Sequence, residues 1–369
     1  MTRDFQAQPA LRPARIEPIF VPRIWGAASL APLFPGAPKL QKSSAGDLPI
    51  GEVWLTGDTC KFADGPFAGL ALGETWREMP ASWAGTRMDT TAAFPLLVKF
   101  LFPAQKLSVQ VHPSDEYARE HEAASSGKGK TEIWYAVAAQ PGADIFVGLK
   151  SGITPEKFQQ AIKDGTVEDC LNRVPVSAGD AIFVPAGTAH TIGPGLILCE
   201  IQQNSDLTYR VYDYGRRNPD GTTRELHVEK AMAVMNFGEQ RGRKVRPARA
   251  AAHGGEIIHY VACKYFVMEK WEITAPIDLR AEPEHFELWI VIAGRGKISW
   301  PTVGENGAGK SDYAPGQTWL VPAAQTSWRI EPAAPTTMLH SYVPDLVRYA
   351  AQLAACGITA EQVEAVVQR

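Results

Sequence analysis

The sequence contains no pair of cysteines at a spacing that would hold a metal ion or carry out redox chemistry. Its five cysteines are odd in number and widely separated, at positions 60, 170, 199, 263 and 356. This argues against a disulfide framework and a cysteine-based zinc site. No segment approaches the roughly 18 apolar residues of a membrane span. Residues 1–15 also lack the apolar run of a signal peptide. We therefore expect a cytoplasmic protein that does not bind a membrane.

The chain also lacks a large excess of charge of either sign. It has 37 Lys and Arg against 40 Asp and Glu, a net charge of −3, which provides no electrostatic attraction for nucleic acid. Basic residues that bind an anionic small molecule must therefore be local. The 369 residues suffice for one large or two ordinary domains. With 32 glycines and 28 prolines, the composition favours a turn-rich β protein over a helical bundle.

Polar and apolar residues alternate over residues 107–111, which predicts a strand. Ser108, Gln110 and His112 then lie on one face, where Gln and His can both reach a single metal ion. A second strand is predicted for residues 132–139, which are rich in β-branched and aromatic residues. Glu132 begins that strand and can supply a third ligand. A fourth candidate, His190, ends the segment GDAIFVPAGTAH at 179–190.

The segment 179–190 resembles the second conserved motif of the cupin β-barrels, and the block 107–132 resembles the first. Four separated motifs, LSVQVHP, GKTE, VPAGTAHTI and EIQQNSDLTYRVYDYGR, occur in the order found in type I phosphomannose isomerases, and they are most similar to the short bacterial form. The resemblance implies a mainly β fold with two cupin-type β-barrels (jelly rolls) and a few peripheral helices. It also implies a metal-dependent aldose–ketose isomerase that interconverts mannose 6-phosphate and fructose 6-phosphate through an enediol, so a small-molecule sugar phosphate is the expected partner.

The resemblance favours one Zn²⁺ per chain, although a donor set without thiolate also suits other divalent metals. The metal ligands that it implies are Gln110, His112, Glu132 and His190. The catalytic residues that it implies are Arg210, Lys130 and Glu200, and the substrate-binding residues are Lys99, Ser108 and Asp206. Lys99 interrupts an apolar run at 94–105, so it either extends to a sheet edge or faces a cavity that holds an anion. Asp206 could equally be a structural partner of Arg210.

An internal repeat divides the chain. Residues 286–296 parallel 131–142, which aligns Glu287 with Glu132, and residues 316–330 parallel 179–192, which places Ser327 where His190 stands. We therefore predict an N-terminal and catalytic metal-binding cupin domain over residues 1–240. A linker follows near 240–255, then a second, degenerate barrel without metal over 256–343. Helices are predicted at 344–369, and a further one at 154–164, between the N-cap Thr154 and Gly165.

Two other classes of function fit the sequence less well. A metal-dependent cupin oxygenase usually needs three histidines, or two histidines and a carboxylate, with open positions on iron, and Gln110 fits that set poorly. A non-catalytic sugar-phosphate-binding cupin would keep the pocket without activity, but the expected charged residues are all present. The remaining histidines fall in no ligand pattern and are expected to be structural; they are His121, His227, His253, His259, His285 and His340.

Overall fold

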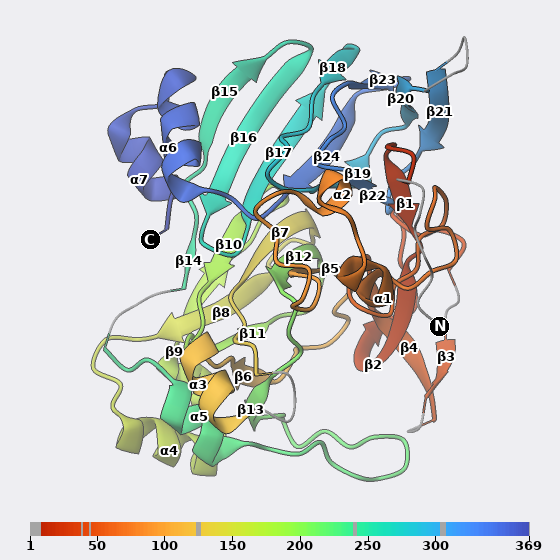
Figure 1. Cartoon of the computed structure of the whole chain (residues 1–369). Coiled ribbons are helices and arrows are strands. Elements are labelled where there is room, and N and C mark those ends of the chain that lie inside the picture. The colour runs from red at the N-terminus through yellow and green to blue at the C-terminus, as the bar shows by residue number, and fades with distance from the viewer. Residues whose placement is uncertain are drawn as a thin grey trace.

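The structure is a computed structural model that describes residues 9–37, 40–43, 46–122, 127–238, 242–302 and 308–368. Its core is formed by antiparallel sheets, with helices at the periphery (Figure 1). The predicted linker includes residues 239–241, which lie outside the described residues. Within the described part of the chain, none of the helices has the length and apolar character needed to cross a membrane.

The first jelly roll consists of an eight-stranded and a five-stranded sheet. The large sheet has the order β14-β10-β7-β12-β5-β4-β2, with β3 on β4. Its strands are β2 (Ile19–Ala27), β3 (Leu40–Ser43), β4 (Gly46–Trp54), β5 (Leu96–Leu101), β7 (Glu132–Ala139), β10 (Ala181–Val184), β12 (Leu196–Gln203) and β14 (Arg243–Lys244). The small sheet has the order β13-β6-β11-β8-β9. Its strands are β6 (Val109–Val111), β8 (Asp144–Leu149), β9 (Leu171–Pro175), β11 (His190–Ile192) and β13 (Tyr209–Tyr212).

The second jelly roll consists of a seven-stranded and a four-stranded sheet. The large sheet has the order β1-β22-β19-β24-β17-β16-β15. Its strands are β1 (Ala14–Ile16), β15 (Ala248–Ala252), β16 (Gly255–Ala262), β17 (Val267–Ile273), β19 (Glu287–Ala293), β22 (Thr318–Val321) and β24 (Thr336–Ser341). The small sheet has the order β18-β23-β20-β21. Its strands are β18 (Ile277–Leu279), β20 (Gly296–Pro301), β21 (Ala308–Tyr313) and β23 (Trp328–Pro332).

Apolar side chains fill the space between the two sheets of each roll. In the first roll, Trp134 of the large sheet and Ile145 of the small sheet belong to one buried cluster. In the second roll, Trp289 of the large sheet and Ile330 of the small sheet belong to another buried cluster. These facing sheets confirm the prediction of a mainly β, jelly-roll fold, although the strands of each roll form two separate sheets among the described residues instead of one closed barrel.

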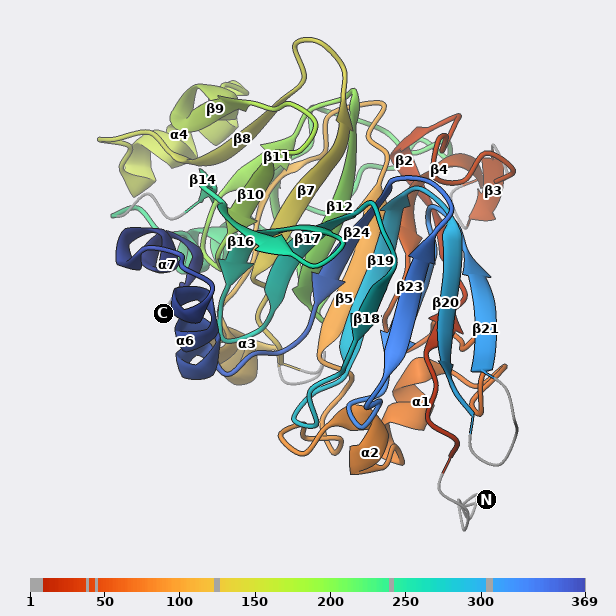
Figure 2. The same ribbon diagram turned by 90° about the horizontal axis from the view of Figure 1, so that it is seen from above.

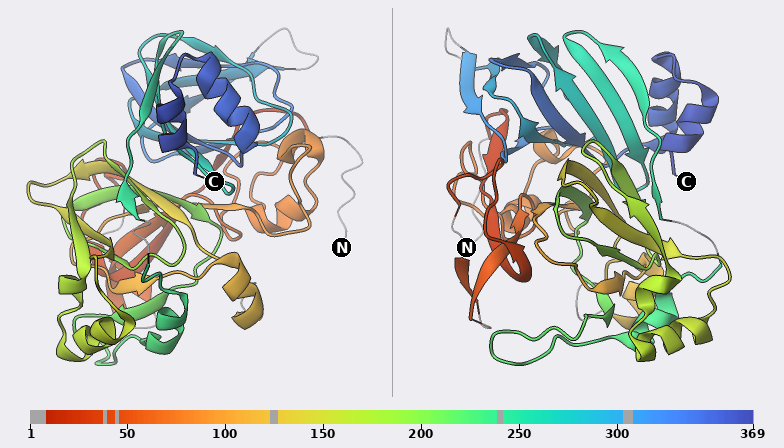
Figure 3. Two further views of the ribbon diagram at one scale, coloured as in Figure 1. Left: turned by 90° about the vertical axis from the view of Figure 1, so that its left-hand side faces the viewer. Right: turned by 180° about the vertical axis from the view of Figure 1, so that it is seen from behind.

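The two rolls pack together through the outer faces of their large sheets. The largest apolar cluster joins Ile133 and Phe100 of the first roll to Leu288 and Leu320 of the second. Figure 2 and both views of Figure 3 show the two rolls side by side, with the large sheets at their junction. Burial of this apolar surface holds the rolls as one body.

The strand registers support the predicted repeat. Glu132 lies opposite Val184 in the β7–β10 pair, and Glu287 lies opposite Val321 in the β19–β22 pair. The first described strand departs from the sequence order, because β1 pairs with β22 of the second roll. Its residues nevertheless fall within the range that we predicted for the first domain.

The helices lie outside the sheets, and three of them fall in the segments where helices were predicted, 154–164 and 344–369. In α4 (Pro155–Asp164), Thr154 accepts a hydrogen bond from the backbone of Lys157, and Gly165 takes a left-handed conformation. The chain ends with α6 (Leu346–Ala355) and α7 (Ala360–Val366), whose Thr359 and Gln362 form the predicted capping box. The other helices are α1 (Leu72–Arg77), α2 (Ala81–Ala84), α3 (Asp115–His121) and α5 (Val228–Val234).

Candidate active site

Three predicted metal ligands lie together inside the first roll. His112 follows β6, Glu132 begins β7 and His190 begins β11. Their possible ligand atoms all lie within 4.8 Å of one another. Oε1 of Glu132 is 3.6 Å from Nε2 of His112 and 3.4 Å from Nε2 of His190. Two imidazoles and a carboxylate that converge in this way form a candidate site for a divalent metal ion.

The hydrogen bonds of both histidines prepare them to bind a metal. Nδ1 of His112 lies 2.7 Å from the carbonyl oxygen of Leu207, and Nδ1 of His190 lies 2.9 Å from that of Thr188. A carbonyl oxygen can only accept, so each Nδ1 carries the proton and each Nε2 keeps a lone pair. Burial lowers the pKa of His112 and lowers that of His190 to about 3, so both rings are neutral. Outer hydrogen bonds of this kind are typical of zinc-binding histidines.

Gln110 lies beside this cluster, as predicted from its spacing to His112. Its Nε2 atom is 3.3 Å from Nε2 of His190, and its Oε1 atom accepts a hydrogen bond of 3.2 Å from Ser108. The amide therefore presents its nitrogen to the cluster. A half-turn about the last side-chain bond would place the oxygen there, which is the atom that binds a metal.

Two glycines in the sequence motifs hold the ligand segments in place. Gly187 has a φ of +81°, and a Cβ atom there would lie 2.9 Å from the carbonyl oxygen of Val234. Its N–H donates to the carbonyl oxygen of His112, which ties the two histidine motifs together. At Gly129, a Cβ atom would lie 2.5 Å from the backbone nitrogen of Asp115. This close approach lets the next residue, Lys130, donate its N–H to Pro113.

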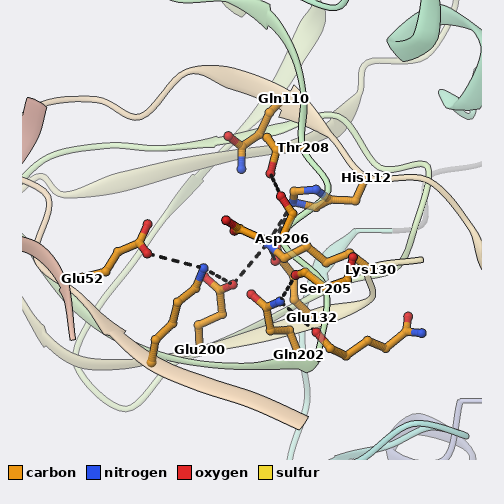
Figure 4. Close-up of polar contacts among 12 residues, drawn as sticks. Glu52, Gln110, His112, Lys130, Glu132, Glu200, Gln202, Ser205, Asp206 and Thr208 are labelled. Atoms are coloured by element: carbon orange, nitrogen blue, oxygen red, sulfur yellow. Dashed lines mark hydrogen bonds and ion pairs between the residues drawn. The ribbon is translucent and has the colours of Figure 1, made fainter. Parts of the chain in front are cut away.

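A row of alternating charges crosses the large sheet of the first roll. It follows adjacent strands from Glu132 on β7 to Glu200 on β12, Lys99 on β5, Glu52 on β4 and Arg23 on β2. Lys130 bridges the first two, with Nζ 2.5 Å from Oε2 of Glu132 and 3.3 Å from Oε1 of Glu200. Nζ of Lys99 lies 3.4 Å from Oε1 of Glu200 and 3.9 Å from Oε2 of Glu52. Arg23 then binds Glu52 through Nε and Nη2, at 2.9 and 3.0 Å. Figure 4 shows Glu52, Glu200 and Lys130 in this arrangement.

The two carboxylates nearest Lys130 have opposite pKa shifts. Burial raises the pKa of Glu200, and the lysines offset this only in part. Burial opposes ionisation of Glu132 as well, but Lys130 and His112 lower the pKa of Glu132 well below its usual value. A pair of carboxyl groups with separated pKa values is a common feature of acid–base sites.

These residues share one cavity of about 340 Å³. Of the predicted catalytic and substrate-binding residues, the structure places all six around it: Arg210, Lys130, Glu200, Lys99, Ser108 and Asp206. Arg210 lies opposite Gln110 in the β13–β6 pair and donates from Nε to Oγ of Ser108, at 3.1 Å. Asp206 is exposed at the cavity, and no ion pair joins it to Arg210 among the described residues.

The sequence analysis missed several cavity residues. Arg23, Glu52, Arg224, Thr208 and His227 also line the cavity. Arg23 begins the segment RIWG at 23–26, which resembles the family's N-terminal strand region, and Glu52 directly precedes VWLTGD, which departs from the family's commonest version. Arg224 and His227 lie in the polar segment 218–236, whose composition predicts a loop followed by a short helix, and His227 was expected to be structural. Pairing of distant strands and loops brings these residues to the site.

A jelly roll whose interior presents two neutral histidines, a glutamate and a glutamine from the two cupin motifs defines a metal-binding protein of the cupin class. Comparisons with known proteins refine this assignment. Residues 14–139 match the sequence profile described as "Phosphomannose isomerase type I, catalytic domain". A probable mannose-6-phosphate isomerase of Bacillus subtilis, GmuF, is 36% identical over 293 residues, which cover 78% of this chain and 87% of that protein.

Two further comparisons extend over most of the chain. The mannose-6-phosphate isomerase of Streptococcus mutans is 33% identical over 80% of this chain and 91% of its own length. The crystal structure of mannose 6-phosphate isomerase from Bacillus subtilis superposes with a TM-score of 0.78 and 31% identity. That superposition covers 89% of this chain and 99% of the other. The chain belongs to the type I phosphomannose isomerase family.

Proposed function

We propose that the chain is a metal-dependent aldose–ketose isomerase that interconverts mannose 6-phosphate and fructose 6-phosphate. The observation that carries the proposal is the buried cluster of His112, Glu132 and His190, whose Glu132 lines the same cavity as Lys130 and Arg210. The relatives that cover most of this chain are named for the same activity. A cytoplasmic location is part of the proposal, supported by the absence of disulfides among the described residues.

The donor set fits a zinc ion. Two neutral imidazole nitrogens and a carboxylate oxygen are the ligands that Zn²⁺ accepts in catalytic sites, and Gln110 can add an amide oxygen. When bound, the metal ion acts as a Lewis acid that stabilises negative charge on the substrate oxygens. We propose that Gln110, His112, Glu132 and His190 hold it.

The reaction moves one proton between two neighbouring carbons. The proton leaves C2 of the aldose and returns at C1, while negative charge gathers on the O1 and O2 atoms. The guanidinium of Arg210 is permanently charged, so we assign it to stabilise an enediolate oxygen without transferring a proton. Lys130, between Glu132 and Glu200, supplies a second positive charge at the same end of the cavity. The raised pKa of Glu200 suits a carboxyl group that can hold a proton near this lysine.

Substrate binding is proposed for the remaining predicted residues. Ser108 links Arg210 to Gln110 through its hydroxyl group and so positions both side chains. Asp206 lies at the exposed side of the cavity, where a carboxylate can accept hydrogen bonds from sugar hydroxyls. Lys99 lines the cavity too, although its ammonium group is shared between Glu52 and Glu200.

A coupled assay with purified protein tests the proposal. Mannose 6-phosphate should be converted to fructose 6-phosphate, and a chelator should abolish the conversion until Zn²⁺ is returned. Binding of mannose 6-phosphate without turnover would identify a sugar-phosphate-binding cupin instead. Oxygen consumption with iron would identify an oxygenase.

A further inference from the structure

We propose that Arg23 and Arg224 bind the phosphate group of the substrate, at the end of the cavity away from the metal ligands. This inference rests on the proposed function, because it takes a hexose 6-phosphate as the ligand. The carbons that react, C1 and C2, must lie near the metal ligands. The phosphate on C6 is at the other end of the sugar, so cationic groups distant from His112 and His190 are the ones to consider.

The order of charges across the sheet places Arg23 at that distant end. Counting from the metal ligand Glu132, the row passes Glu200, Lys99 and Glu52 before it reaches Arg23. Each step moves one strand further along the sheet, from β7 to β2. Arg23 nevertheless lines the same cavity as Glu132. A ligand that contacts both residues must span the cavity, as an open-chain hexose phosphate does.

The other cations of the cavity have competing partners. The ammonium groups of Lys99 and Lys130 each lie between two carboxylates, and their side chains are only 5% and 4% exposed. Arg210 is opposite Gln110, next to the metal ligands, where it is needed for the reacting oxygens. These three residues are therefore poor candidates for the phosphate. The ammonium group of Lys99 bridges Glu52 and Glu200, so less of its charge is available to a phosphate.

Arg23 and Arg224 are held in place by carboxylates but keep donors free. Arg23 uses Nε and Nη2 for Glu52 and one N–H of Nη1 for the carbonyl oxygen of Pro22, at 3.4 Å, and its side chain remains 30% exposed. Arg224 donates from Nε to Oδ2 of Asp213, at 2.8 Å, and also from Nη2 to Oδ1 of the same residue. Its side chain is 20% exposed, and Nη1 has no hydrogen-bond partner among the described residues. A guanidinium fixed on one edge can present its other N–H groups to a phosphate.

The balance of charge also favours an anion here. Asp213 binds both Arg216 and Arg224, so one carboxylate serves two guanidinium groups. Burial, and after it the charge of Arg224, lowers the pKa of Arg210, and Arg23 contributes to the same effect. Arg224 and Arg23 are thus each close enough to Arg210 to repel its charge. A phosphate dianion between Arg23 and Arg224 would relieve this repulsion.

The test uses the variants Arg23→Gln and Arg224→Gln in the metal-loaded protein. Loss of one charged hydrogen-bonding group typically costs about 1.5–3 kcal/mol, which is roughly a 10- to 100-fold change in binding. We expect the KM for mannose 6-phosphate to rise by about that factor in each variant, with kcat changed by no more than a few fold. Arg217→Gln is the matched control, because Arg217 is an exposed neighbour that contacts only the backbone of Gly221. It should leave KM unchanged.

A second variant guards against loss of structure. Arg23→Gln removes a partner of the buried Glu52, whereas Arg23→Lys keeps the charge and loses only the forked geometry. We expect Arg23→Lys to fold and to show an intermediate KM. A wild-type KM in both Arg23 variants, or a loss of kcat without a change in KM, would overturn the assignment of Arg23. The same outcomes in Arg224→Gln would overturn that of Arg224.

Direct binding separates this inference from the proposed function. Phosphorus NMR of mannose 6-phosphate reports binding of the phosphate group whether or not the sugar is isomerised. If the wild-type protein broadens the signal but does not turn the sugar over, the isomerase proposal fails. Weaker broadening in the two Gln variants would then still support the phosphate site. Equal broadening in the wild type and the variants, or none in the wild type, contradicts it.

Discussion

Glu200 and His340 occupy equivalent positions in the two jelly rolls. Glu200 lies opposite Trp134 on one side and Lys99 on the other. His340 lies between Trp289 and Glu269 in the same way. The second roll therefore repeats this central pair of charges with the signs reversed. Where Lys99 meets Glu200 in the first roll, Glu269 meets His340 in the second, at 3.0 Å.

The stability of the second roll should depend on the protonation of His340. Burial opposes protonation, but hydrogen bonds to Glu269 and Glu287 raise the pKa of His340 to about 9. Because this exceeds the value of about 6.5 in an unfolded chain, the stabilisation is complete below about pH 6.5 and is lost as the pH rises through 9. The shift corresponds to at most about 3 kcal/mol. Urea unfolding should show a loss of stability over this interval.

The variant His340→Gln isolates this effect. Its free energy of unfolding should be lower than that of the wild type at about pH 6, and it should change little between pH 6 and 9. Other titrating groups near His340 are His285, which lines the same small cavity, and His259 and Tyr349, which share Glu269 with it. The exposed His121→Gln variant controls for loss of a histidine elsewhere. Parallel curves for wild type and His340→Gln would exclude His340 as the origin.

The amount of bound metal should depend on the cluster of His112, Glu132 and His190 in the first roll. We expect about one zinc ion per chain by elemental analysis, with metal and activity both lost in His112→Ala and His190→Ala. His121→Ala, an exposed histidine, should retain both. A second equivalent of metal that persists in His190→Ala would show that the second roll also binds metal, although Ser327 stands in the position of His190. Full metal content in the two ligand variants would refute the ligand assignment.

Arg210 should affect the rate without affecting the metal. Removal of one donor to a developing oxyanion typically costs about 10²–10³ in kcat. We expect a loss of that size in Arg210→Ala and a large loss in Arg210→Lys, which keeps the charge but not the planar fork. Steady-state kinetics and elemental analysis on the same samples test this, with Arg217→Ala as the control. Near-normal kcat and KM with metal retained would leave Glu200 and Lys130 as the charged groups that act on the substrate.

Lys99 should be essential for stability. Lys99→Met leaves Glu52 and Glu200 buried with one cation fewer, and breaking a buried ion pair in this way costs about 3–5 kcal/mol. The loss should appear as a lower midpoint in urea, and the exposed Lys163→Met should not show it. Adding Glu200→Gln to Lys99→Met removes one of the unpaired carboxylates and should recover part of the loss. No recovery would mean that the two residues are not coupled.

The sequence alone was sufficient to predict the parts of the site that depend on local order. His112 and Gln110 share a strand face two residues apart, and Gly187 forms the turn that precedes His190, so short motifs predicted these residues. Local capping likewise predicted helix α4. The sequence predicted β-barrels, but each roll consists of two separate sheets among the described residues. Whether two sheets join into a closed barrel depends on the hydrogen bonds between their edge strands. That property is not visible in the pattern of any single strand.

What the sequence could not predict depends on which strands become neighbours. Lys99 was noticed as a charge in an apolar run, but its partners Glu52 and Glu200 lie on strands distant in sequence. Arg23 reaches the cavity only because β2 pairs with β4. His340 falls in no ligand pattern and was expected to be structural, and its pairing with Glu269 could not be predicted because the alignment of the repeat does not extend to β17 and β24. A register between distant strands carries no signal in one sequence.

The pairing of β1 with β22 sets an order of events during synthesis. Ile16 leaves the ribosome about 300 residues before Thr318, its partner in the sheet. At translation rates of about 5–20 residues per second, this interval is on the order of 15–60 s. The first roll can begin to fold during that time, but Ala14–Ile16 must wait without their partners. The edge of the second roll is therefore completed by a strand that is made about 300 residues earlier than its partner.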